Sequence, residues 1–192
     1  GIVGGTASGF NLEYADLNND GRTDIIGAIG TESLAYSLGW LEQPKDKDSA
    51  WIHHPIGSLA PDAITGIVLT DIDSDCDSDA FVGSYSSGPR EGDGEVRESD
   101  ALGRLAWFEN PGATEIISSV WPRHDVSRRK RGMFDKFITR DIDGDGDIDL
   151  LGTRGNSAPF DGVFWLEQQR SSEPSARFTP ARQNESPEMP LP

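Results

Sequence analysis

Short apolar runs alternate with glycine, aspartate and proline along this chain, and they predict strands. Residues 65–69, 79–82, 105–108 and 137–138 have strand length and are bounded by such turn-forming residues. No long stretch repeats apolar residues with the 3.6-residue period of a helix. The pattern therefore predicts an all-β chain built from many short strands.

One acidic pattern, D-x-[DN]-x-D-G-x-x-D, occurs three times. It occupies residues 16–24, 71–79 and 141–149, and Cys76 replaces its glycine in the second copy. Acidic or amide side chains at positions 1, 3 and 5 of a tight loop direct oxygen atoms to one centre, and glycine at position 6 permits a sharp turn. Without a cation, carboxylates placed this close repel one another. Each loop is therefore a candidate Ca²⁺ site.

The predicted ligands come from equivalent positions of the three loops, with position 7 giving its backbone carbonyl, and they imply up to three Ca²⁺ ions. They are Asp16, Asn18, Asp20, Arg22 and Asp24; Asp71, Asp73, Asp75, Asp77 and Asp79; and Asp141, Asp143, Asp145, Asp147 and Asp149. An EF-hand would need a glutamate at position 12 and flanking helices, but position 12 is glycine or valine. A cluster of Asp/Asn/Gly turns without metal is the alternative interpretation.

Two further markers follow the acidic loops and indicate an internal repeat. A W-[LF]-E sequence places Trp40, Trp107 and Trp165 at one repeat position, and a W-x-x-H sequence begins at Trp51 and again at Trp121. We expect these tryptophans to pack between repeats and the Trp/His pairs to be structural. The expected divisions are 1–57, an incomplete repeat; 58–127, with an inserted loop at 84–103; 128–170; and a disordered tail, 171–192.

The acidic loops, each followed by apolar residues and glycine, resemble FG-GAP/VCBS repeats of integrin-type and bacterial extracellular proteins over about residues 10–170. This resemblance implies a β-propeller with calcium at the hairpins of successive blades, and a secreted, cell-surface or periplasmic location. About three blades are visible, whereas closed propellers have roughly four to eight. The resemblance therefore implies a partial propeller, part of a larger one, or a homo-oligomer.

The overall charge and composition exclude several classes of partner. Asp and Glu number 33 against 17 Lys and Arg, a net charge of -16, which opposes binding to nucleic-acid phosphates. No apolar stretch approaches the ~18 residues that predict membrane insertion, and residues 1–5 lack the features of a signal peptide. Cys76 is the single cysteine, so no intrachain disulfide forms.

The leading functional hypothesis is a non-catalytic, calcium-stabilised module that binds a glycan or a protein, and no catalytic residue is assigned. Residues 153–162 combine Arg, Asn, Asp and an aromatic side chain, as a sugar site does. The alternatives are part of a secreted polysaccharide-degrading lyase or hydrolase, and a purely structural or oligomer-forming repeat. Turnover of polysaccharides would separate the first two hypotheses.

Overall fold

The described part of the chain is all-β, as the sequence predicts. A computed structural model describes residues 6–30, 37–60, 62–85, 103–116, 120–129, 133–155 and 161–169. These residues form three antiparallel sheets and contain no helix, and thus no helix that is long and apolar enough to cross a membrane. Most of the predicted inserted loop and the whole predicted tail lie outside the described residues.

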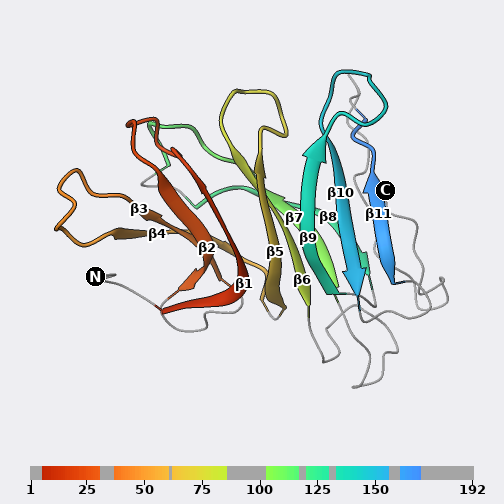
Figure 1. Cartoon of the computed structure of the whole chain (residues 1–192), viewed down its shortest axis with the longest axis horizontal. Coiled ribbons are helices and arrows are strands. Elements are labelled where there is room, and N and C mark those ends of the chain that lie inside the picture. Colours follow the sequence, from red (N-terminus) through yellow and green to blue (C-terminus); the bar gives the residue numbers. More distant parts are fainter. Residues whose placement is uncertain are drawn as a thin grey trace.

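Each sheet is a meander in which consecutive strands are neighbours (Figure 1). Sheet one has the order β1 (Thr6–Ala15), β2 (Asp24–Gly30), β3 (Ser37–Glu42) and β4 (Ile52–Ser58). Sheet two has the order β5 (Ala63–Thr70), β6 (Asp79–Tyr85), β7 (Gly103–Phe108) and β8 (Arg123–Arg129). Sheet three contains β9 (Met133–Arg140), β10 (Asp149–Gly155) and β11 (Gly162–Leu166).

The first strands of the three sheets are joined by polar side chains. The Asn11 amide of β1 donates to the carbonyl oxygens of Thr65, at 2.5 Å, and Asp135, at 2.7 Å, which belong to β5 and β9. The Thr65 hydroxyl donates to the carbonyl of Phe134 at 2.8 Å. Since these contacts link residues far apart in sequence, they fix the first strands of all three sheets relative to one another.

Two apolar clusters fill the spaces between the sheets. Ile26 and Trp40 of sheet one belong to a cluster with Ile67 and Phe108 of sheet two. A second cluster joins sheets two and three and is rich in aromatic side chains: Phe81, Trp107, Phe134 and Phe137. Complete burial of one such side chain contributes about 1.5–3 kcal/mol, so these clusters hold the sheets face to face.

Glycine permits the close approach of sheet three to sheet two. A Cβ atom on Gly83 would lie 2.6 Å from the carbonyl oxygen of Phe134 and 2.6 Å from the Phe137 ring, and Gly66 has the same neighbours at 2.6 Å. Because backbone atoms of β9 occupy this space, a side chain at either position would force the sheets apart.

Candidate metal centre

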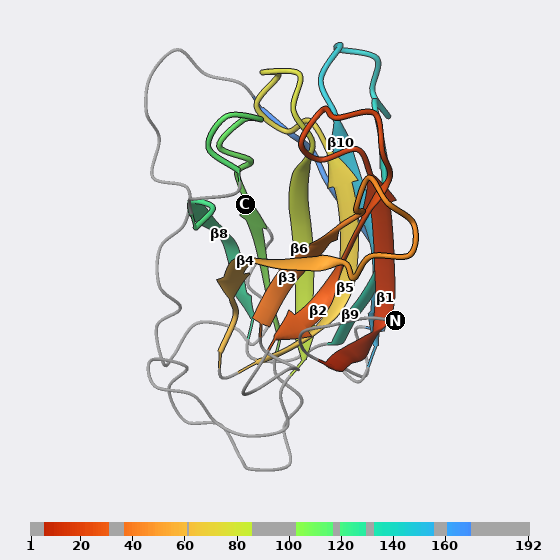
Figure 2. The same ribbon diagram turned by 90° about the vertical axis from the view of Figure 1, so that its left-hand side faces the viewer.

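The three acidic loops lie at the same end of the sheets, at the top of Figure 1 and, in the view turned by 90°, at the top of Figure 2. Loop one (residues 16–24) joins β1 to β2, loop two (71–79) joins β5 to β6, and loop three (141–149) joins β9 to β10. Loop one contacts loop two, because the Asn19 side-chain amide donates to the Asp77 carboxylate at 3.4 Å. Gln168, which follows β11, donates its backbone N–H to Asp149 of loop three and its side-chain amide to the Ile72 carbonyl of loop two, at 2.8 Å. The topology thus gathers the acidic residues at one edge of the molecule.

All three loops share an unusual backbone conformation at positions 4 and 6. The φ angles there are positive: Asn19 57°, Gly21 84°, Ser74 67°, Cys76 76°, Gly144 82° and Gly146 97°. The sequence pattern identified the turn at position 6 but missed the one at position 4. The signal was weak because asparagine, serine and glycine occupy that position, although asparagine and glycine tolerate positive φ well.

The first aspartate of each loop organises the backbone around its carboxylate. Asp16 accepts N–H donors from Asp20 at 2.9 Å and Gly21 at 2.7 Å. In loop two, the carboxylate of Asp71 accepts the N–H groups of Asp75 and Cys76, both at 3.1 Å. In loop three, the Asp141 carboxylate accepts the N–H groups of Gly144 and Gly146. Local hydrogen bonds of this kind explain why these nine residues form the same loop three times.

The last aspartate of each loop is fully buried and ties the loop to its sheet. Its carboxylate accepts the N–H of position 2 and the N–H of the residue that follows the W-[LF]-E marker. The donors are Leu17 and Gln43 for Asp24, Ile72 and Asn110 for Asp79, and Ile142 and Gln168 for Asp149, at 2.8–3.1 Å. The sequence predicted these aspartates only as metal ligands and missed their anchoring role.

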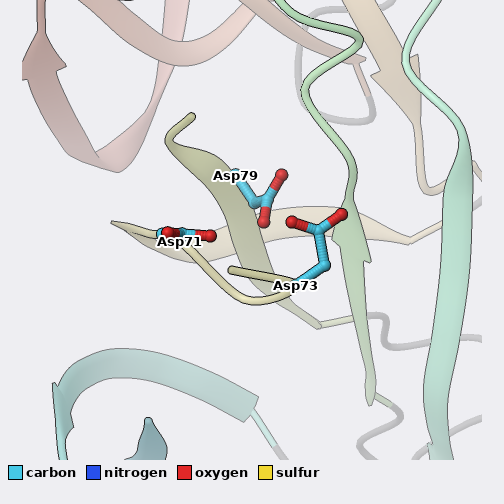
Figure 3. Close-up of side chains that lie close together, drawn as sticks. All are labelled: Asp71, Asp73 and Asp79. Carbon is cyan, nitrogen blue, oxygen red and sulfur yellow. The ribbon is translucent and has the colours of Figure 1, made fainter. Parts of the chain in front are cut away.

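In each of two loops, loop two and loop three, three carboxylates lie close together. One oxygen each from Asp71, Asp73 and Asp79 lies within 4.8 Å of the other two, and Asp141, Asp143 and Asp149 repeat the arrangement. Figure 3 shows the first of these triads, in which the three side chains converge between the loop and the start of β6. Among the described residues, these are the two groups of His, Cys, Asp or Glu that could hold a metal ion. Carboxylate oxygens are the ligands that hard cations prefer.

The remaining predicted ligands have other partners. The position 5 carboxylates of Asp20, Asp75 and Asp145 do not belong to the triads, and each accepts the N–H of position 7, from Arg22, Asp77 and Asp147, at 2.9–3.1 Å. At position 7 the Asp77 carboxylate faces Asn19 of loop one, and the Asp147 side chain is buried. These residues shape the loops around the convergent carboxylates.

Burial raises the pKa of the Asp79 carboxyl to about 7. Hydrogen bonds from Asn110 and Ile72 oppose this change, and the charges of Asp73 and Asp75 add to it. The pKa of Asp73 is also raised, by burial first and then by the charge of Asp75. Carboxylates that resist ionisation in this way gain the most from a nearby cation, because the cation favours their charged form.

The pKa of the Asp149 carboxyl is shifted in the opposite direction from that of Asp79, below its usual value. Burial acts to raise it, but the hydrogen bonds donated to this carboxylate, from Ile142 and Gln168 among others, outweigh burial, and the pKa is lowered. The anchoring hydrogen bonds therefore favour the charged carboxylate that a cation requires.

Loop one differs from the other two loops because it contains a positively charged side chain, that of Arg22. Its position 3 is Asn18, so it lacks the third carboxylate of the triads. The Arg22 guanidinium pairs with the carboxylate of Asp20, lies 3.8 Å from that of Glu42, and donates from Nε to the Gln43 carbonyl at 2.7 Å. Arg22 was expected to contribute only its carbonyl, and the structure shows that its side chain partly neutralises the loop.

The W-[LF]-E and W-x-x-H markers meet on neighbouring strands. Trp40 stacks on His54 with ring centroids 4.4 Å apart, and His54 Nε2 lies 2.8 Å from the carboxylate of Glu42. Trp107, His124 and Glu109 repeat this arrangement in sheet two, with a stacking distance of 4.2 Å. In both sheets the glutamate of the W-[LF]-E marker therefore pairs with a histidine of its own sheet.

Comparisons with protein-family models, with curated proteins and with solved structures found no match to this chain. The fold and the site define its class: over the residues that the structure describes, the chain is all-β, with three antiparallel sheets and two aspartate triads that could hold a metal ion.

Proposed function

We propose that this chain is a calcium-binding β-propeller segment of the FG-GAP/VCBS type. The observation that carries the proposal is the convergence of Asp71, Asp73 and Asp79, repeated by Asp141, Asp143 and Asp149 in the equivalent loop. The agreement of two loops 70 residues apart in backbone φ and hydrogen bonding supports a common binding role.

The chemistry of the triads favours calcium over other metals. Both triads consist of carboxylates, whereas zinc and copper sites draw on histidine and cysteine. Calcium takes six to eight oxygen ligands in flexible geometry, at about 2.3–2.6 Å. Water and the oxygens of positions 5 and 7 would supply the ligands that three carboxylates do not.

The arrangement of the sheets supports the propeller architecture. Consecutive antiparallel meanders, two of four strands and one of three, pack face to face with their first strands joined at Asn11, which is the pattern expected of blades around an axis. We further propose that the module binds a glycan or a protein and is not catalytic, a role supported by the resemblance of its loops to extracellular repeat proteins.

Calcium titration with thermal unfolding tests the proposal. Binding to the folded state alone adds about 2.7 kcal/mol of stability at a free calcium concentration of 100 times Kd, so we expect a rise in Tm relative to protein in chelator. The variant Asp71→Asn/Asp73→Asn should lose part of this rise, and adding Asp141→Asn/Asp143→Asn should remove most of the remainder.

Asp48→Asn is the matched control, because Asp48 is exposed and lies in a turn outside the three loops. It should retain the full calcium response. Equal melting temperatures of the wild-type protein in calcium and in chelator would contradict the metal sites. Turnover of a polysaccharide panel by the purified protein would contradict the non-catalytic role.

A further inference from the structure

Each of the three sheets has two different faces, and equivalent residues form the same face in every sheet. In sheet one Ile26 lies opposite Trp40 of the next strand, in sheet two Phe81 lies opposite Trp107, and in sheet three Leu151 lies opposite Trp165. Each of these apolar residues comes two positions after the buried aspartate of its acidic loop. We call the side of a sheet that carries this row its tryptophan face.

Inside the molecule, the tryptophan face of one sheet packs against the opposite face of the next. Trp40 shares a cluster with Ile67 and Val82 of sheet two. Trp107 shares a cluster with Phe137 of sheet three. The two internal interfaces are therefore built from the same two faces in the same order.

The tryptophan face of sheet three has no sheet against it among the described residues. It carries Ile138, Leu151 and Trp165, which align across β9, β10 and β11, and Val163, two residues before Trp165 on β11. Trp165 is 45% exposed, whereas Trp40 and Trp107 are 0% and 8% exposed. Ile138 and Val163 beside it are also exposed. This is the face on which a following sheet would pack.

The opposite face of sheet one is the matching surface at the other end. Leu12 of β1 occupies the same position as Ile67 of β5 and Phe137 of β9. The residues opposite them on the next strand are Gly27, Val82 and Gly152, respectively. Ile67 and Phe137, which pack on the preceding sheet, are each 2% exposed, but Leu12 is 62% exposed. Tyr14, two residues along β1 on the same face, is also exposed. This face, carrying Leu12 and Tyr14, is the one that would receive a preceding tryptophan face.

We propose that the Trp165 face of one copy of this chain packs against the Leu12 face of a second copy. Each internal interface pairs a tryptophan face with the opposite face of the next sheet, and the Trp165 and Leu12 faces are one of each kind. Because the two faces differ, the copies associate head-to-tail and not through two identical faces. Two copies joined at both ends form a closed ring of six sheets, within the roughly four to eight that β-propellers contain. The residues named on the two faces all lie outside the acidic loops, so this inference does not depend on calcium binding.

Sedimentation velocity and light scattering of the full chain test the association. We expect a species of twice the 20.8 kDa chain mass that dissociates on dilution. Trp165→Glu and Leu12→Glu should each shift the protein to the monomer mass. Val120→Glu is the control: Val120 is exposed, precedes β8 in sheet two and lies on neither face, so this variant should keep the wild-type mass.

Mixing the two variants tests the head-to-tail geometry and shows that both are folded. The Trp165→Glu chain keeps its Leu12 face and the Leu12→Glu chain keeps its Trp165 face, so an equal mixture should regain a two-chain species through one intact interface. A wild-type monomer at all concentrations would overturn the proposal. So would a dimer that Trp165→Glu dissociates and Leu12→Glu does not, because that result indicates packing of identical faces.

Discussion

The buried carboxylate of Asp79 accepts the backbone N–H of Asn110 at 2.9 Å, across 31 residues of sequence. Asp79 begins β6 and Asn110 follows the end of β7, so this hydrogen bond fixes loop two to the sheet at the point where the acidic side chains converge. Asp24 and Asp149 make the same connection to Gln43 and Gln168. The anchoring of the loop and its candidate metal site therefore depend on one side chain.

Stability in chelator should fall as the pH rises from about 4 to about 7. Burial raises the pKa of Asp79 to about 7 from 3.8, so the folded state binds more protons than the unfolded state in this interval, and stability decreases with pH. Asp79→Asn should give a flatter profile of Tm against pH, and calcium should reduce the decline in the wild-type protein. A profile of Tm against pH that is unchanged by Asp79→Asn would show that the Asp79 carboxyl is not the cause of the decline in stability.

Cys76→Gly should stabilise the protein. Cys76 has a φ of 76°, and a left-handed conformation costs a non-glycine residue about 1–2 kcal/mol. We expect a gain of about 1 kcal/mol in the free energy of unfolding in urea after allowance for the greater chain entropy of glycine. Gly146→Ala, at the equivalent position of loop three with a φ of 97°, is the reciprocal variant and should lose stability.

Gly83→Ala should destabilise the contact between sheets two and three. The new methyl group would lie 2.6 Å from the Phe134 carbonyl oxygen, which belongs to the backbone and cannot move aside easily. Overpacking of this kind costs about 1–3 kcal/mol, measurable by urea unfolding. Gly155→Ala is the control, because the nearest atom to its added Cβ is 4.0 Å away. Equal stability of the two variants would show that the sheets can separate without cost.

Arg22→Gln should destabilise the protein modestly in calcium-free buffer. The substitution removes the charge that pairs with Asp20 and lies near Glu42, and half-exposed ion pairs of this kind contribute about 0.2–1 kcal/mol. The loss should shrink at high salt, which screens the remaining repulsion. Lys47→Gln, which removes the same charge from an exposed turn, should leave Tm nearly unchanged in low and high salt.

Several features of the candidate site follow from local sequence. Asp71, Asp73 and Asp79 lie within nine residues, and so do Asp141, Asp143 and Asp149, so their spacing alone predicts convergence once the loop forms. Four strands were predicted in the same way, since the apolar runs at 65–69, 79–82, 105–108 and 137–138 lie within β5, β6, β7 and β9. β8 (Arg123–Arg129) has no such run and was not predicted. The repeated tryptophans indicated packing between sheets, which the burial of Trp40 and Trp107 confirms.

Other features depend on residues that only the fold brings together. Asn110 anchors Asp79 from another strand, and Asn11 joins Thr65 and Asp135 across 54 and 124 residues. The contacts of Arg22 with Glu42 and Gln43, the raised pKa of Asp79 and the unequal exposure of Trp40 and Trp165 likewise arise from packing between residues distant in sequence. Local sequence specifies the acidic loops, because backbone turns and hydrogen bonds within nine residues are set by neighbouring side chains. Which carboxylates are buried, anchored or paired depends on the tertiary structure, because burial and charge arise from contacts between distant parts of the chain.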